Sequence, residues 1–155
     1  MTPDQMYRLA ADLGEAKNRQ NVEDALKFMH DDIVLESPAW GLVARGKDAN
    51  RNVLKSFFAD YPDYNVTFDH YLADDRHFVG WGTVRMTMAA GAHDAAGQAP
   101  NGRRVELPVT IRMTFKDGLI ASEVFSCDLM QIALQSGIDP DVMAKAVFAS
   151  EETAA

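Results

Sequence analysis

Residues 104–115 read RVELPVTIRMTF, and in this stretch every odd-numbered position is apolar while the even-numbered positions are mostly polar. Successive side chains of a β-strand point to opposite faces of the sheet, so a two-residue period predicts a strand. One face of this strand is expected in the core, and the other in water or against a partner. The stretch thus predicts a sheet that is covered on one side.

Strands are also expected on both sides of this stretch, at residues 33–37, 65–72, 78–88 and 119–127. Lys116-Asp117-Gly118 is a hairpin turn signal that joins 104–115 to the last of these strands. Residues 89–102, rich in Gly, Ala and Asn, are expected to form a loop. Residues 39–43 are interpreted as a loop carrying Trp40, which either forms the floor of a pocket mouth or packs into the core.

Helices are expected mainly before the sheet. Thr2 and Gln5 form a capping-box pattern around Pro3, and Asn21 caps a second helix that ends at residues 30–32. Three further helical stretches are expected, at residues 46–61, 131–135 and 139–149. Helices followed by a mostly antiparallel, curved sheet indicate an α+β fold in which the N-terminal helices pack in the concave face of the sheet.

Composition limits the classes of protein that this chain can belong to. The 155 residues carry a net charge of −8, which opposes nucleic-acid and acidic-membrane partners. Their number fits one domain, expected at residues 1–149, followed by a disordered tail at 150–155. No signal-peptide or membrane-span pattern is present, so a cytoplasmic protein is expected. The four histidines show no metal-ligand spacing, so no metal site is predicted, and the single Cys127 is interpreted as a core residue.

Asp128 stands where an apolar strand runs directly into an apolar helical stretch, Leu129 to Leu134. Two interpretations are open. Asp is a preferred helix N-cap because its carboxylate accepts hydrogen bonds from the first free amides of the helix. Alternatively, a carboxylate at such a junction can be desolvated and tuned for acid/base chemistry.

The order of elements, the Pro100-Asn101-Gly102-Arg103 run before a long strand, and the spacing of Asp128 to Gln135 and Gly137 resemble the SnoaL-like polyketide cyclases. These belong to the nuclear transport factor 2-like (NTF2-like, cystatin-like) superfamily, whose fold is a cone. The resemblance covers nearly the whole chain. It implies that Asp128 is the catalytic general acid and base of an intramolecular aldol closure, with no metal or organic cofactor. It also implies that Asp128, Ser126 and Val124 face inward.

The resemblance has two departures near this carboxylate: Val124 stands where the family often has Trp, and the polar residue two positions before Asp128 is only a serine, Ser126. The ketosteroid isomerase branch fits less well. Ser37, Leu13 and Ile111 stand where that branch has its base, its helix Tyr and its strand Asp.

Two functions remain open from the sequence: an acid/base enzyme centred on Asp128, or a carrier of a small apolar or aromatic molecule. The expected substrate pocket consists of Leu35, Ser37, Trp40, Phe57, Leu107, Val109, Ile111, Val124, Ser126 and His93. A third possibility is a dimerisation module. A homodimer through the outer face of the sheet, which carries Thr110, Arg112 and Thr114, is expected in any case.

Overall fold

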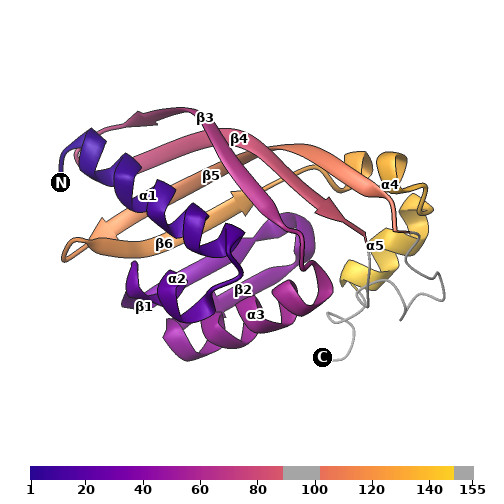
Figure 1. Ribbon diagram of the computed structural model, residues 1–155, viewed down its shortest axis with the longest axis horizontal. Helices are drawn as coiled ribbons and strands as arrows, with labels where there is room; N and C mark the ends of the chain where they lie inside the picture. Colours follow the sequence, from indigo (N-terminus) through magenta and orange to yellow (C-terminus); the bar gives the residue numbers. More distant parts are fainter. Residues whose placement is uncertain (89–101, 149–155) are drawn as a thin grey trace.

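The computed structural model describes residues 1–88 and 102–148, and Figure 1 shows how its helices and strands are arranged. Within these residues, six strands form one sheet in the order β2-β1-β6-β5-β4-β3. The strands are β1 (Met29–Ser37), β2 (Leu42–Arg45), β3 (Asn65–Ala73), β4 (His77–Thr87), β5 (Arg104–Lys116) and β6 (Leu119–Ser126). Neighbours are antiparallel except for the parallel pair β1 and β6. The predicted α+β fold is confirmed.

The helices are α1 (Pro3–Asn18), α2 (Val22–Lys27), α3 (Gly46–Asp60), α4 (Leu129–Ser136) and α5 (Pro140–Phe148), with a short 3-10 helix η1 (Pro38–Trp40). Helix α1 packs across β3 at one side of the sheet, while α3 packs against β1 at the other (Figure 1). Helices α4 and α5 lie beyond the end of β6. The N-terminal helices therefore cover one face of the sheet.

Strand β5 shows the alternation that its sequence predicts. Val105, Leu107, Val109, Ile111 and Met113 are all buried, and the residues between them are exposed. It pairs with the whole length of β4, from Thr114 opposite His77 to Arg104 opposite Thr87. The central strands thus present one apolar face to the helices.

Strand β4 approaches β3 very closely at Gly82. A Cβ atom on Gly82 would lie 1.8 Å from the carbonyl oxygen of Thr67, so no larger residue fits there without a shift of backbone. The β3–β4 register also slips between Phe68 and His70. Irregularities of this kind bend a strand and increase its twist, which curves the sheet around the helices.

The first helix begins as predicted. Thr2 accepts a hydrogen bond from the Gln5 backbone, and the Gln5 side chain accepts one from the Thr2 backbone. The second helix is capped by Asn21 but ends at Lys27, earlier than expected. Met29 is already part of β1, where it is fully buried and pairs with Ile120. Tertiary pairing overrides the local helical pattern there.

The stretch expected as a loop at residues 39–43 is mostly regular structure. Pro38–Trp40 form η1, Gly41 adopts a left-handed conformation, and Leu42 starts β2. Strand β2 pairs with β1, with Ala44 opposite Leu35. Four residues are too few to show a strand period, which is why the pattern did not predict β2.

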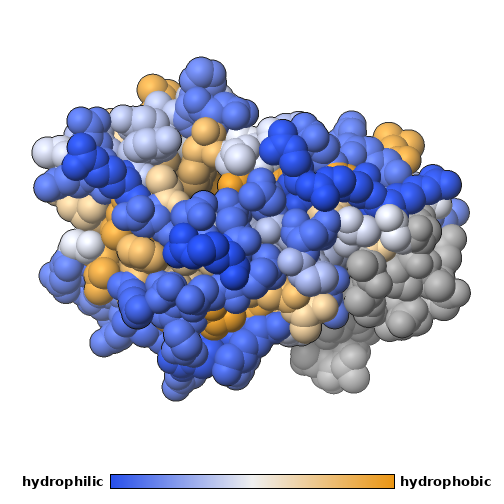
Figure 2. All heavy atoms as spheres, in the orientation of Figure 1, coloured by the Kyte–Doolittle hydropathy of each residue, from blue (hydrophilic) through white to orange (hydrophobic). Residues whose placement is uncertain are grey.

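Three expectations lie outside the described residues: most of the loop at 89–102, His93 within it, and the tail at 150–155. Among the described residues, no helix is long and apolar enough to span a membrane. The face shown in Figure 2 is mostly hydrophilic, with smaller groups of hydrophobic residues between the hydrophilic ones.

Candidate functional site

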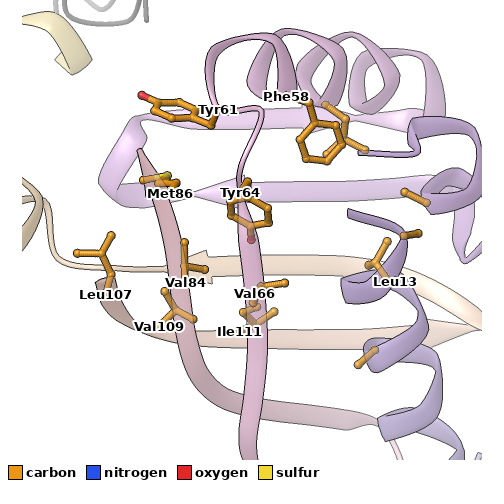
Figure 3. Close-up of a cluster of buried hydrophobic side chains, with 14 of the residues drawn as sticks. Leu13, Phe58, Tyr61, Tyr64, Val66, Val84, Met86, Leu107, Val109 and Ile111 are labelled. Atoms are coloured by element: carbon orange, nitrogen blue, oxygen red, sulfur yellow. The ribbon is translucent and has the colours of Figure 1, made fainter. Parts of the chain in front are cut away.

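A cavity of about 300 Å³ lies between α3 and the sheet. Its wall is mainly apolar and aromatic, and it combines residues from α1, α3 and the sheet, which are far apart in the sequence. The lining residues are Lys17, Leu35, Ser37, Trp40, Leu42, Val53, Leu54, Ser56, Phe57, Phe58, Asp60, Tyr61, Tyr64, Val84, Met86, Leu107, Glu123, Phe125 and Cys127. Figure 3 shows Phe58 and Tyr61 on the α3 side of this region, facing Val84, Met86 and Leu107 on the sheet.

The structure brings five of the residues predicted for the pocket together on this wall: Leu35, Ser37, Trp40, Phe57 and Leu107. Leu35 and Ser37 come from β1, where the two-residue period puts both on the covered face. The Ser37 hydroxyl donates a hydrogen bond to the Phe125 carbonyl at 3.3 Å, which fixes β1 against β6. Their role in binding a ligand stays a prediction.

Two other predicted residues are buried but lie off this wall. Val109 is in the core, and Ile111 lines a second, much smaller cavity of about 10 Å³ behind the first. Lys17, Tyr64 and Glu123 border both cavities.

The second half of strand β6 turns Glu123 and Phe125 toward the cavity. Phe125 lies opposite Ile111, and Glu123 lies opposite Met113, in the antiparallel pairing with β5. Directly opposite residues of such a pair share a face, and Ile111 and Met113 are both buried. Glu123, Phe125 and the following Cys127 therefore face inward.

The inward facing that the resemblance implied for Val124 and Ser126 is accordingly wrong. Val124 lies opposite Arg112 and Ser126 opposite Thr110, and both partners are exposed on the outer face. The β5–β6 register decides this, because a strand that buries Glu123 must turn its neighbours outward. Val124 and Ser126 are thus not part of the cavity wall.

Lys17 and Glu123 form a buried ion pair on the cavity wall. The Lys17 Nζ lies 2.6 Å from Glu123 Oε1 and 2.7 Å from Oε2. Only 10% of the Lys17 side chain and 2% of the Glu123 side chain are exposed. This pair joins α1 to β6 and is the strongest polar feature of an otherwise apolar cavity.

Neither residue was predicted from the sequence, although a signal exists. Lys17 follows Ala10 and Leu13 at helical spacing, so it lies on the buried stripe of α1. Glu123 lies two residues before Phe125 in a strand whose inward face the pattern left undecided. A lysine on the buried stripe of a helix is itself the signal, because a buried lysine is almost always paired with a carboxylate.

Two tyrosines add hydroxyl groups to the site. Burial raises the pKa of Tyr64, and the nearby Glu123 and Cys127 raise it further. Burial, with a smaller contribution from Asp60, raises the pKa of Tyr61 to about 12. The Tyr61 hydroxyl is buried and has no hydrogen-bond partner within the described part of the chain. Both phenols are therefore protonated near neutral pH.

Cys127 lies on the wall as a thiol. Burial raises its pKa to about 11, against a hydrogen bond with Trp40 that lowers it. The thiolate is the nucleophilic form of cysteine, so this raised pKa opposes a catalytic thiol.

Asp128, the predicted catalytic residue, is exposed and caps α4. One of its carboxylate oxygens accepts a hydrogen bond from the Met130 amide at 2.8 Å, so the capping interpretation is confirmed. It is not part of the cavity wall. Its acid/base role is untested and stays a prediction.

The two residues spaced with Asp128 in the family pattern also have structural contacts. The Gln135 side chain bonds both the amide and the carbonyl of Glu106, each at 2.8 Å. Strand β6 ends before it reaches that part of β5, so Gln135 takes the place of a neighbouring strand and hydrogen-bonds the backbone of β5 there. Gly137 ends α4 in a left-handed conformation. The spacing therefore identifies a helix docked on the end of a strand.

Within residues 1–88 and 102–148, no group of three or more His, Cys, Asp or Glu side chains is placed to hold a metal ion.

A family model for the SnoaL-like domain matches residues 10–123, which is well over half of the chain. The chain belongs to the SnoaL-like domain family. A search of curated proteins finds no match to this SnoaL-like chain. The resemblance noted from its sequence is thus confirmed at the level of the family.

Solved structures support the same fold. A candidate polyketide cyclase from Xanthomonas campestris aligns with a TM-score of 0.76 at 19% identity, covering 86% of this chain and 97% of that one. IdmH, a candidate polyketide cyclase from Streptomyces antibioticus, aligns with a TM-score of 0.71 at 21% identity, covering 89% and 100%.

A third structure has a ligand in its description. It is a protein from Catenulispora acidiphila with a ketosteroid isomerase-like fold, in complex with trimethylamine, with a TM-score of 0.73 at 14% identity over 86% of this chain and 95% of that one. At these identities the likeness shows the fold of the SnoaL-like chain, and its activity must be argued from its own residues.

Proposed function

We propose that this SnoaL-like protein binds a small, mainly apolar or aromatic molecule that carries one hydrogen-bonding group. The observation that carries the proposal is the composition of the cavity wall: aromatic and aliphatic side chains surround one buried ion pair, Lys17–Glu123. Ligand pockets are mostly apolar, with a few polar groups that fix the orientation of the ligand.

The volume of the cavity limits the size of that molecule. About 300 Å³ is at the lower end of the range for ligand pockets, which run from roughly 300 to 1,000 Å³. A compact molecule of two or three rings matches this space better than a long extended chain. The ligand's polar group is expected at Lys17 and Glu123, and its apolar body against Leu35, Phe57 and Leu107.

The charges on the cavity wall favour a ligand with no net charge. The Lys17 and Glu123 charges cancel each other, and the remaining charged residue of the wall is the half-buried Asp60. A fatty-acid carboxylate would meet Glu123 and Asp60 without a spare cation on the wall. Neutral ketones and phenols are therefore favoured over fatty acids.

Ring closure of a polyketide with Asp128 as general acid and base is the competing proposal, which the family resemblance supports. The contacts of Asp128 supply only the cap of α4. The binding proposal is the broader of the two, because it holds whether or not the protein turns its ligand over.

A cavity-filling variant with a matched control tests the proposed function. Wild-type protein is expected to be stabilised against heat by 2-tetralone, a bicyclic ketone, and to bind it in calorimetry, while lauric acid gives no shift. Val53→Trp fills the wall from α3 and should abolish the 2-tetralone shift. Val43→Trp makes the same change at an exposed site on β2 and should retain it. Equal shifts in both variants would contradict binding in this cavity.

A further inference from the structure

The Lys17–Glu123 pair is unusual because it is buried beside empty apolar space. Burying two charges is expensive, and replacing a buried ion pair with apolar residues of similar volume is often neutral or stabilising. Helix α1 is also held in the hydrophobic core by Met6, Ala10 and Leu13. The stability of the folded protein is therefore a weak explanation for two buried charges at this position.

The pair retains hydrogen-bonding capacity toward the cavity. An ammonium has three donors, and Glu123 takes two of those on Lys17. Within the described residues, no other acceptor is hydrogen-bonded to the Lys17 ammonium. Each Glu123 oxygen accepts one of these bonds and has a further lone pair. A ligand can therefore meet a donor and an acceptor side by side.

We propose that Glu123 and Lys17 are a proton-transfer pair that enolises a ketone bound in the cavity; this inference rests on the proposed function. A Glu123 oxygen removes a proton from the carbon next to the carbonyl. The C–H electron pair forms the new C=C bond, and the carbonyl π pair moves to oxygen. Lys17 donates a hydrogen bond to that oxygen and then a proton. The products are the enol, a neutral amine and a neutral carboxylic acid, so charge and atoms balance.

The other ionisable groups of the wall are less suited to this step. Cys127, Tyr61 and Tyr64 are held in their neutral forms by burial, so none of them supplies a base near neutral pH. Asp60 is a carboxylate at the end of α3, with no cation paired to it within the described residues. It offers a base without an adjacent donor for the carbonyl oxygen. Only the Lys17–Glu123 pair places both functions together.

The test follows exchange of the α-hydrogens of 2-tetralone for deuterium in D₂O by proton NMR. Wild-type protein is expected to accelerate exchange above buffer, since a positioned acid/base group contributes about 10²- to 10⁴-fold. Glu123→Gln should lose about 10²-fold of this rate or more. Glu106→Gln makes the same carboxylate-to-amide change at an exposed site on β5, away from the cavity wall, and should keep the wild-type rate.

Glu123→Gln leaves Lys17 without its partner, so a second variant covers the risk of misfolding. Lys17→Met/Glu123→Leu removes both charges together and should remain folded by circular dichroism, bind 2-tetralone and show no exchange above buffer. Exchange at the wild-type rate in this folded double variant would overturn the inference. A covalent adduct on Lys17 after borohydride treatment with the ketone would also overturn it, because that result assigns an imine at Lys17 instead of an enol.

Calorimetry separates this inference from the proposed function. If wild-type protein binds 2-tetralone but does not accelerate exchange, the proton-transfer inference fails and the binding function stands. If it binds no 2-tetralone, the proposed function fails, and the inference with it.

Discussion

Lys17 on α1 and Glu123 on β6 are 106 residues apart in the chain, yet the ammonium nitrogen of one lies 2.6 Å from a carboxylate oxygen of the other. Both side chains are buried, and both border the same apolar cavity. An ion pair therefore joins the first helix to the last strand of the sheet at the cavity where a ligand is expected.

The two charges should be strongly coupled in stability. Glu123→Leu leaves a buried ammonium without a partner and should lower the free energy of unfolding by about 3–5 kcal/mol, whereas Lys17→Met/Glu123→Leu should return it to near the wild-type value or above. Urea unfolding of the two single variants and the double variant measures this. The same cycle at the exposed Arg85–Glu106 pair is the control and should give about 1 kcal/mol or less. Equal coupling at both pairs would contradict the assignment of a buried pair.

Tyr61→Phe should stabilise the protein, because the Tyr61 hydroxyl is buried without a partner in the described structure. An unsatisfied buried group costs about 1–3 kcal/mol, and phenylalanine removes it with little change in shape. Thermal and urea unfolding near pH 7 measure the gain. A loss of stability in Tyr61→Phe would show that this hydroxyl has a partner in solution.

The same residue predicts a pH dependence. The pKa of Tyr61 is about 12 in the folded protein, against about 10 in an unfolded chain. Between these values the folded state holds the proton more tightly, so stability falls as pH rises from about 10 to 12. Wild-type protein should lose more stability over this window than Tyr61→Phe does. Tyr64 shifts in the same direction in both proteins, so the difference between the two curves isolates Tyr61.

Gly82 should not tolerate alanine. The added Cβ would lie 1.8 Å from the Thr67 carbonyl oxygen, so the strands must move apart at a loss of about 1–3 kcal/mol or more. Gly14→Ala is the matched control, because its Cβ would meet only Val66 and Phe68 side chains at 3.6 and 3.7 Å. Replacing a glycine within a helix should gain about 0.5–1 kcal/mol. Similar melting temperatures for the two variants would contradict the close approach of β3 and β4.

Asp128 is expected to act through the cap of α4. Asp128→Ala should cost about 1 kcal/mol, while Asp128→Asn, a good N-cap itself, should keep wild-type stability. Asp139→Asn is the control, since Asp139 accepts a hydrogen bond from the Asp141 amide in the same way. In the exchange assay, all three variants should match wild type. Loss of exchange in Asp128→Asn alone would instead support the acid/base role that the family resemblance implies.

The homodimer through the outer face of the sheet remains a prediction. That face is exposed at Thr110 and Arg112, and Trp81 lies opposite Thr110 with 37% of its surface exposed. Arg112→Glu, which reverses a charge at the centre of the face, should shift the protein toward monomer. Size-exclusion chromatography with light scattering over a range of concentrations measures this. A wild-type protein that is monomeric at every concentration would contradict the dimer.

The fold was largely predictable because its strongest signals are local. The two-residue period of β5 and the capping box at Thr2 depend only on neighbouring residues, and both predictions are confirmed. The four-residue β2 was missed because it is too short to show a period. The end of α2 was misplaced because Met29 pairs with Ile120, which is distant in sequence.

The site was less predictable, because it depends on the register of distant strands. The pairing of β5 with β6 decides that Glu123 faces inward and Val124 outward, and the local pattern of β6 left that facing undecided. The ion pair needs α1 and β6 to meet, which no spacing in the sequence encodes. The capping contact of Asp128, in contrast, was predictable because it depends only on local sequence. Its implied catalytic role requires a pocket, and Asp128 does not line the cavity.

Calorimetry with two matched ligands tests the central claim most directly. 2-Tetralone and tetralin share the same bicyclic frame and differ in one carbonyl oxygen. If Lys17 and Glu123 receive the ligand's polar group, wild-type protein should bind the ketone at least about tenfold more tightly, since a hydrogen bond to a charged group contributes about 1.5–3 kcal/mol. Lys17→Met/Glu123→Leu should bind both ligands about equally. Equal affinities in wild-type protein, or an undiminished preference in the double variant, would contradict the account.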